Sequence, residues 1–179
     1  MAKIVKLNAI ETPRLYLYPF VEADINLAYI GWLNDPDVVR FSNQRFSNHT
    51  KESALEYLSS FNKTSNHFLA IKEKLSGTMI GTLTIYHNLN HQTADLGIML
   101  GDKAIWGCGY GKEAFSAVVN ILLGTCGVRK VTAGTLSLNL AMIKIMIGAG
   151  LKLEASRRSQ ELLDGQPADI IYYSKFKNG

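Results

Sequence analysis

The chain has 179 residues, of which 47% are hydrophobic, and this size fits one domain over residues 1–179 that buries its own core. Its net charge of +4 comes from Lys and Arg scattered in pairs, so no basic run predicts a nucleic-acid partner. Residues 1–11 lack the features of a signal peptide, and no apolar run is as long as a membrane span. We therefore expect a cytoplasmic protein with no membrane partner. Cys108 and Cys126 have neither metal-ligand nor disulfide-framework spacing, so we expect reduced thiols and no metal.

The N-terminal part of the chain reads as one strand followed by two helices. Residues 14–20 alternate in the period of a strand. Residues 22–33 have apolar side chains at helical spacing, which predicts a first helix. A second helix is predicted over residues 51–61, with Thr50 as its N-cap. The segment between the helices, residues 38–49, is expected to be irregular.

The middle of the chain is rich in β-structure. Residues 67–72, 79–86 and 94–100 each have the composition of a strand, and short polar turns separate them. Short turns join antiparallel neighbours, so these three strands predict an antiparallel meander.

The C-terminal part alternates helices and strands. A helix is predicted over residues 112–123, a strand over 128–135 and a short helix over 140–147. Two last strands are predicted over residues 151–157 and 170–176. The mixed order of elements predicts an α+β fold, in which helices flank a sheet.

A loop with three alternating glycines precedes the helix that begins near residue 112. Gly107, Gly109 and Gly111 allow backbone conformations that other residues avoid and let a ligand approach the main chain. The following helix adds its unpaired N–H groups, so the loop is suited to a phosphate or diphosphate. Such a string alone also occurs in turns that only reverse the chain. A dinucleotide site would need a βαβ unit, which this order lacks, and no Gly-Lys-Ser/Thr closes a Walker loop.

With these residues in place, the chain resembles the GNAT superfamily of N-acetyltransferases, and within it the RimJ/RimL-like type that acetylates the alanine N-termini of ribosomal proteins. The superfamily motif Gln/Arg-x-x-Gly-x-Gly/Ala corresponds to residues 106–111, with Trp106 in the first place. The resemblance extends to residues 12–15, 32–38 and 139–151 and covers nearly the whole chain.

The resemblance implies an acetyl-CoA-dependent transferase that acetylates a primary amine. It implies a mostly antiparallel sheet of about seven strands, flanked by about four helices, with a V-shaped split between the fourth and fifth strands. Acetyl-CoA is then a co-substrate whose pantetheine arm follows the fourth strand and whose phosphates lie at the glycine loop. The implied cofactor-binding residues are Ile98, Met99, Leu100, Trp106, Gly107, Cys108, Gly109, Tyr110, Gly111, Lys112, Asn139 and Lys144. Asn139 also suits a helix N-cap, and Lys144 a solvated surface.

The residues that would move protons are less well marked. Asp95 shares a strand face with Gly97 and Met99, and its offset from the glycine motif resembles that of the general base in the histone-acetylating branch, so it is our candidate base. It would otherwise be a strand-edge residue bound to a turn. The hydroxyl residues that relatives use as the acid are replaced by Met142 and Met146. The nearby candidates for the acid are Ser137, Tyr86 and His91, of which we select Ser137.

The acceptor site in proteins of this fold is built by the first two helices and their connecting loop, here residues 38–49. Phe41, Asn43 and Arg45 are the candidate substrate-binding residues, because they offer a ring, an amide and a guanidinium. They suit an amino sugar or a peptide N-terminus equally well. A homodimer is compatible with the sequence. Two alternatives remain open: a non-catalytic acyl-CoA sensor, suggested by the methionines in place of Ser and Tyr, and a protein that binds another nucleotide through the glycine loop.

Overall fold

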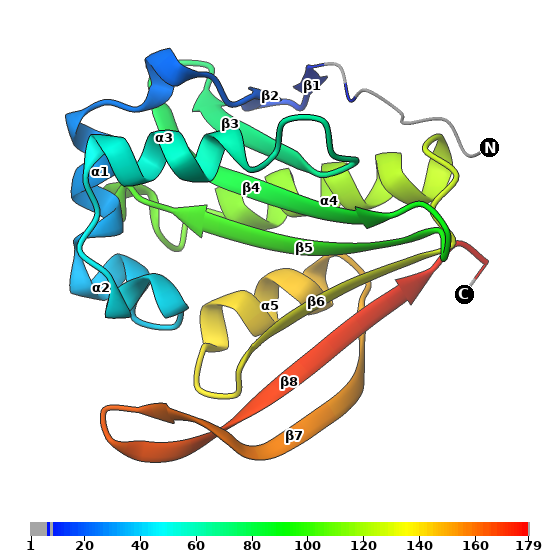
Figure 1. Ribbon diagram of the computed structural model, residues 1–179. Helices are drawn as coiled ribbons and strands as arrows, with labels where there is room; N and C mark the ends of the chain where they lie inside the picture. Colours follow the sequence, from blue (N-terminus) through cyan, green and yellow to red (C-terminus); the bar gives the residue numbers. More distant parts are fainter. Residues whose placement is uncertain (1–6, 8, 179) are drawn as a thin grey trace.

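The structure is a computed structural model that describes residue 7 and residues 9–178, and its centre is one eight-stranded sheet (Figure 1). The strand order across the sheet is β1-β2-β3-β4-β5-β6-β8-β7. The strands are β1 (Ile10–Glu11), β2 (Leu15–Pro19), β3 (His67–Glu73), β4 (Met79–Asn88), β5 (Thr93–Leu100), β6 (Lys130–Leu136), β7 (Lys152–Leu163) and β8 (Gln166–Phe176). The helices are α1 (Leu27–Leu33), α2 (Pro36–Val39), α3 (Lys51–Ser59), α4 (Tyr110–Gly124) and α5 (Leu140–Gly148). These elements confirm the predicted α+β class.

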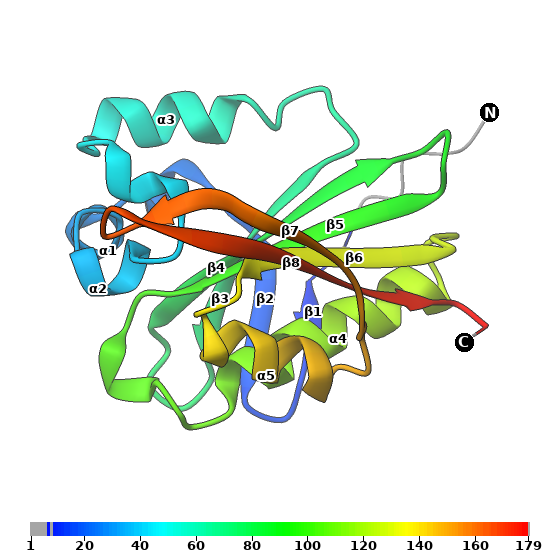
Figure 2. The same cartoon turned by 90° about the horizontal axis from the view of Figure 1, so that it is seen from below.

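Helices cover both faces of the sheet, with α4 and α5 on one side and α1 to α3 on the other (Figure 2). The alternation of side chains along the strands produces the two layers. Ala94 and Leu96 of β5 are buried in the core that contains Phe115 of α4. Phe68 of β3 is buried on the opposite side, where it joins a second cluster with Tyr29 of α1.

Strands β5 and β6 are the one parallel pair of the described sheet, and they separate after only three residue pairs. Their register is Thr93↔Lys130, Ala94↔Val131 and Asp95↔Thr132. Beyond these pairs β5 continues along β4 to Leu100, whereas β6 continues along β8 to Leu136. Figure 1 shows the two strands diverging from this point. The V-shaped split is therefore present where the family resemblance implies it.

Helices α3 and α4 form where the sequence predicts them, and each shows a feature on which its prediction rests. Thr50 caps α3, because its Oγ1 accepts a hydrogen bond of 3.3 Å from the Ser53 N–H. In α4 the side chains of Phe115 and Val118 are completely buried. Tertiary packing of the amphipathic face therefore reinforces the local signals in both helices.

The predicted helix over residues 22–33 is wrong in its first half. The chain forms a 3-10 turn over Glu22–Asp24, and α1 begins only after Asn26, whose side chain accepts a hydrogen bond of 3.0 Å from the Tyr29 N–H. An Asn at this point favours a cap over a helix interior, since its side chain competes for backbone N–H groups. The segment 38–49 is also more regular than expected, because it contains the end of α2 and a 3-10 helix over Asn43–Phe46.

The C-terminal hairpin of β7 and β8 is longer than predicted, and β1 is an additional short strand. Nearly every residue of β7 is exposed, so β7 has no alternation of apolar side chains that would mark its length. None of the helices in the described part of the chain has the length and apolar character needed to cross a membrane. The two cysteines are not joined to each other: Cys108 is exposed and Cys126 is buried.

Candidate active site

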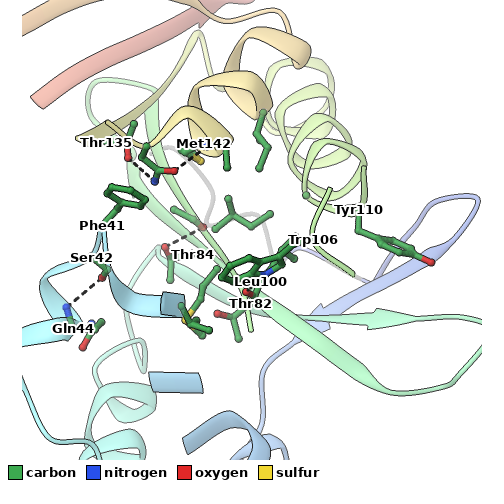
Figure 3. Close-up of a pocket in the computed structure, with 18 of the residues that line it drawn as sticks. Phe41, Ser42, Gln44, Thr82, Thr84, Leu100, Trp106, Tyr110, Thr135 and Met142 are labelled. Carbon is green, nitrogen blue, oxygen red and sulfur yellow. Dashed lines mark hydrogen bonds between the residues drawn. The ribbon is translucent and has the colours of Figure 1, made fainter. Parts of the chain in front are cut away.

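A cavity of about 750 Å³ lies along the open edge of β5, where the sheet splits. Its walls come from both halves of the molecule. Figure 3 shows Phe41, Ser42 and Gln44 at one end and Trp106 and Tyr110 at the other. The cavity therefore joins the glycine loop to the loop that follows α1.

The glycine loop reaches α4 with its backbone N–H groups free of helical partners. Gly107 and Gly109 have φ values of +78° and +84°, a region that strongly favours glycine, and Gly109 is the N-cap of α4. The first backbone bond of the helix runs from the Glu113 N–H to the Gly109 carbonyl. The amides of residues 110–112 therefore face outward at the positive end of the helix, and Lys112 and Lys144 also line this end.

Gly111 has a different role from the two glycines before it. A Cβ at this position would lie 2.8 Å from Cδ1 of Ile145 and 3.2 Å from Cδ1 of Leu100. Its missing side chain lets α4 pack closely against α5 and β5, so Gly111 shapes the cavity through packing.

A clamp made by Arg14, Thr12 and Glu113 holds the glycine loop against the start of β2. The Arg14 Nε lies 2.6 Å from Glu113 Oε2, and its Nη1 donates to the Cys108 carbonyl at 3.0 Å. Thr12 Oγ1 donates to the same carboxylate at 2.7 Å. Burial of Glu113 opposes ionisation, but the hydrogen bonds from Thr12 and Arg14 outweigh it and hold the pKa of Glu113 below its usual value. The sequence resemblance included Thr12 and Arg14 but gave them no role.

The middle of the cavity is bounded by the edge of β5 and the start of α5. Ile98, Met99 and Leu100, three of the residues expected to bind the cofactor, line it. Asn139 lines it too and caps α5, because its Oδ1 accepts from the Met142 N–H at 3.2 Å while its Nδ2 donates to Thr135 Oγ1 at 3.0 Å (Figure 3).

All the predicted cofactor-binding residues except Cys108 line this cavity. The Cys108 side chain is exposed on the loop, and its carbonyl is the part that the clamp uses. Met142 lines the cavity, whereas Met146 is completely buried in the core. Met146 therefore occupies a packing position.

Asp95 lies at the vertex of the split, outside the residues that line the cavity. Its Oδ1 accepts a hydrogen bond of 2.5 Å from Thr132 Oγ1 across the last β5–β6 pair. Asp95 remains in contact with solvent. Desolvation by the surrounding protein nevertheless raises the pKa of Asp95, and the hydrogen bond from Thr132 only partly opposes this effect. Gly97, two residues farther on the same strand face, does line the cavity.

Two tyrosine hydroxyls connect the surroundings of Asp95 with the cavity wall. Tyr86 is the residue opposite Asp95 in the β4–β5 register, and its hydroxyl lies 3.1 Å from the hydroxyl of Tyr57. Tyr57 lines the cavity. Burial, followed by the hydrogen bond to Tyr86, raises the pKa of Tyr57, so this phenol stays protonated.

Ser137 and His91, the other predicted acid candidates, are not among the residues that line the cavity. The Ser137 N–H donates to the Asp169 carbonyl at 2.9 Å, which joins the end of β6 to β8. His91 lies in the turn between β4 and β5, where its N–H donates to Asn88 Oδ1. His91 therefore lies in the turn that precedes β5, whereas Ser137 lies between Thr135 and Asn139, which line the cavity, without lining it itself.

Of the three predicted substrate-binding residues, only Phe41 lines the cavity. Asn43 is exposed elsewhere on the 3-10 turn. Arg45 Nη1 donates to the Ser42 carbonyl at 2.8 Å, its Nη2 donates to the Leu162 carbonyl at 3.1 Å, and it lies 3.8 Å from Glu161. Arg45 therefore fixes its loop to the β7–β8 hairpin.

We call this junction the loop–hairpin contact, and it has two further parts. Phe41 packs against a small buried cluster formed by Leu136, Leu163 and Ala168. Arg40 Nη2 lies 3.1 Å from Asp164 Oδ2 at the tip of the hairpin. The contact joins residues far apart in the sequence, so no local pattern could reveal it. The acceptor-end residues that sequence reasoning missed, Ser42, Tyr29, Tyr57 and Phe68, come from four separate segments.

The split sheet, the helix N-terminus with free amides and the cavity between them define an acyltransferase fold. Residues 14–152 match the family model described as an acetyltransferase (GNAT) domain. The chain therefore belongs to the GNAT acetyltransferase family, whose members use acetyl-CoA to acetylate amines.

Solved structures confirm this fold. A GNAT-family acetyltransferase from Bacillus anthracis aligns with a TM-score of 0.82 at 16% identity, over 96% of this chain and 99% of that one. RimL, a ribosomal L7/L12 alpha-N-protein acetyltransferase in complex with CoA, aligns with a TM-score of 0.83 at 15% identity, over 94% and 98%. A spermidine N-acetyltransferase from Vibrio cholerae, in complex with CoA and spermine, gives 0.81 at 12%, over 93% and 98%. No curated protein matches the chain in sequence.

Proposed function

We propose that the protein transfers the acetyl group of acetyl-CoA to the nitrogen of a primary amine, either a polypeptide N-terminus or the amine of an amino sugar or other small molecule. The observation that carries the proposal is the cavity, which connects a helix N-terminus suited to phosphates with a second, aromatic end across the open edge of β5. Family membership supports the donor.

The glycine-loop end fits the donor substrate. The free amides of residues 110–112 and the side chains of Lys112 and Lys144 would bind the CoA phosphates. The backbone of residues 98–100 would pair with the amide groups of the pantetheine arm. This arrangement directs the thioester into the middle of the cavity, toward Gly97 and Asn139.

Acetyl transfer requires an uncharged amine, and we assign proton removal to Asp95. Gly97 is two residues away, about 6.6 Å along the strand, so one water molecule would carry the proton from the ammonium to the carboxylate. The amine nitrogen then bonds to the thioester carbon, and charge develops on the carbonyl oxygen. The C–S bond breaks, and the thiolate leaves with the second amine proton.

The position of Ser137 gives no support to its role as the acid. Tyr57 lines the cavity, and its raised pKa keeps the phenol protonated, so it can offer a hydrogen bond but gives up its proton reluctantly. We propose that the Tyr57 hydroxyl, supported by Tyr86, donates a hydrogen bond to the reacting groups, while the leaving thiolate takes the second proton of the amine.

The finer assignment to the RimJ/RimL-like type is part of this proposal. It rests on the resemblance in residues 12–15, 32–38 and 106–111, and a polypeptide N-terminus would be its acceptor. The similarity to the solved structures concerns the fold and does not choose among acceptors.

The test is release of CoA thiol from acetyl-CoA in the presence of individual amines, measured with a thiol-reactive dye. We expect at least one amine to raise the rate above the hydrolysis background. If CoA raises the melting temperature but none of the amines raises the rate, the sensor alternative replaces the proposed transfer.

A further inference from the structure

The acceptor end of the cavity has an aromatic wall. Tyr29 and Phe68 are almost completely buried, at 2% and 6% exposure, and they are fixed by neighbouring rings. The Tyr57 ring meets Phe68 edge-on, with centroids 5.3 Å apart. Phe41 closes the side formed by the loop–hairpin contact. The half-buried rings of Phe41 and Tyr57 therefore offer a rigid apolar surface to a ligand, and Tyr29 and Phe68 support it from behind.

Negative charge is scarce in this wall. Asp37 is the one carboxylate among the described residues that line the cavity. It is largely exposed, and its Oδ2 already lies 3.2 Å from Lys103 Nζ, which also lies 2.7 Å from Asp35. A second ammonium group inside the cavity would therefore find no free carboxylate and would lose its hydration without compensation.

The other polar side chains at this end are neutral, and several already have partners, such as the Tyr57 hydroxyl with that of Tyr86. Ser42 Oγ accepts a hydrogen bond of 3.3 Å from the Gln44 N–H, and Thr84 Oγ1 lies 3.4 Å from the Gly97 carbonyl (Figure 3). Thr82 lines the cavity beside them. Such groups orient one amine, but they do not offer the many hydrogen bonds that a sugar ring requires.

From this wall we propose that the acceptor is a primary amine with a single cationic nitrogen, carried next to an uncharged aromatic or branched apolar group. The inference rests on the proposed acetyl transfer and narrows its acceptor. Two sources share this chemistry: a small monoamine with an apolar body, and a polypeptide whose first residue is apolar. Polyamines and amino sugars do not share it.

The first experiment compares kcat/KM for 2-phenylethylamine, a tetrapeptide that begins with Phe, spermidine and glucosamine. At least one of the first two should exceed both others by about ten-fold or more, because burial of a ring favours it and an unpaired charge or hydroxyl disfavours its rivals. The ratio between phenylethylamine and the peptide identifies the source. If spermidine or glucosamine were acetylated as fast as the two apolar amines, or faster, this inference would be wrong, but the proposed acetyl transfer would stand. The inference would also be wrong if all four compounds gave only the background rate while another polyamine or amino sugar was acetylated. If every amine tested gave only the background rate, the proposed acetyl transfer itself would be contradicted.

The second experiment adds the missing charge. Ser42→Asp keeps the ability to cap the 3-10 turn, because Asp is also a good N-cap, and it places a carboxylate on the cavity wall. The ratio of spermidine to phenylethylamine turnover should rise about three- to ten-fold, the size of one partly exposed charged contact. Gln44→Glu is an independent route to the same change, should Ser42→Asp fold poorly.

Two matched variants isolate the position of the charge. Ser42→Asn has the size and capping ability of Asp without its charge, and Asn48→Asp adds the charge on an exposed part of the same loop. Neither should shift the ratio by more than about two-fold, since a screened surface charge acts weakly. The assignment of this wall to the acceptor would be contradicted if neither Ser42→Asp nor Gln44→Glu raised the ratio of spermidine to phenylethylamine turnover. An equal rise of this ratio with Asn48→Asp would also contradict it.

Discussion

Asp95, the residue proposed to accept the amine proton, lies where desolvation disfavours its charge. Asp95→Asn should lower kcat/KM by a factor of about 10² to 10⁴, the usual contribution of a general base, and leave acetyl-CoA affinity nearly unchanged. In the wild type kcat/KM should fall as pH drops through the raised pKa of Asp95, and the variant should lack this limb. Initial rates from pH 5 to 9 measure both effects. A wild-type rate for the variant at neutral pH would show that Asp95 is structural.

The same substitution has an opposite expectation for stability. Because the folded-state pKa of Asp95 is raised, the folded protein binds this proton more tightly than the unfolded chain, and ionisation above the ordinary pKa near 3.8 works against folding. Asp95→Asn removes that penalty and still accepts a hydrogen bond from Thr132. We expect a melting temperature at pH 7 equal to or above that of the wild type. A clearly lower melting temperature would mean that the hydrogen bond from the Thr132 hydroxyl to the charged carboxylate stabilises the fold.

Gly109 and Gly111 should respond differently to substitution. Gly109→Ala places a residue with a Cβ at φ +84°, which costs about 1–2 kcal/mol of stability. The variant should still fold, but CoA should raise its melting temperature less than it raises that of the wild type. Gly111→Val places methyl groups against Ile145 and Leu100, so it should lower the free energy of unfolding by about 1–3 kcal/mol or more, with or without CoA. Thermal unfolding with and without CoA separates the two. Equal behaviour of the variants would contradict the division of roles.

The N-terminus of α4 depends on the clamp, and the clamp depends on an ionised Glu113. Glu113→Gln should destabilise the protein by about 0.5–2 kcal/mol at pH 7, since it weakens the bonds to Arg14 and Thr12. The pKa of Glu113 is lowered in the fold, so its stabilisation is present above the ordinary value near 4.5 and is lost as pH falls through the lower folded-state value. Denaturation of both proteins from pH 7 to pH 3 measures this. If the difference in stability between the wild type and Glu113→Gln did not shrink as the pH falls, the charge of Glu113 would not be the source of the stabilisation.

Elements with strong local signals were predictable from the sequence. Thr50 and the apolar stripe of α4 define two helices by short-range chemistry alone. The first helix was predicted too long, because the capping preference of Asn26 opposes the apolar periodicity around it. The extent of β7 was missed, because an exposed strand has no buried face to mark it.

The two ends of the candidate site differ in the same way. The glycine-loop end comes mostly from one continuous stretch, residues 97–112, so a motif was enough to locate it. The acceptor end gathers residues from α1, α3, β3 and the loop after α2, and only the fold shows that they meet. Arg45 illustrates the limit: its charge suggested a ligand, but a contact with Leu162 more than a hundred residues away engages it.

The whole molecule relies on the loop–hairpin contact to hold the two sides of the split together at its open end. Arg45→Ala should therefore raise acceptor KM and also lower the free energy of unfolding by about 1–2 kcal/mol, while the KM of acetyl-CoA stays near its wild-type value. Steady-state kinetics and thermal unfolding of the same preparation measure both. A higher acceptor KM at unchanged stability would return Arg45 to the role of a direct ligand.

The early separation of β5 from β6 also affects the time course of amide hydrogen exchange. Beyond Asp95, the backbone groups of β5 that would face β6 in a continuous sheet have no neighbouring strand. Those amides should exchange with deuterium quickly in the free protein, whereas amides directed toward β4 should exchange slowly. A pantetheine arm that takes the place of the missing strand would slow the first group and leave the second as it was. Those amides among residues 97–99 that point away from β4 therefore report occupancy of the site, and they can be read before any acceptor is known.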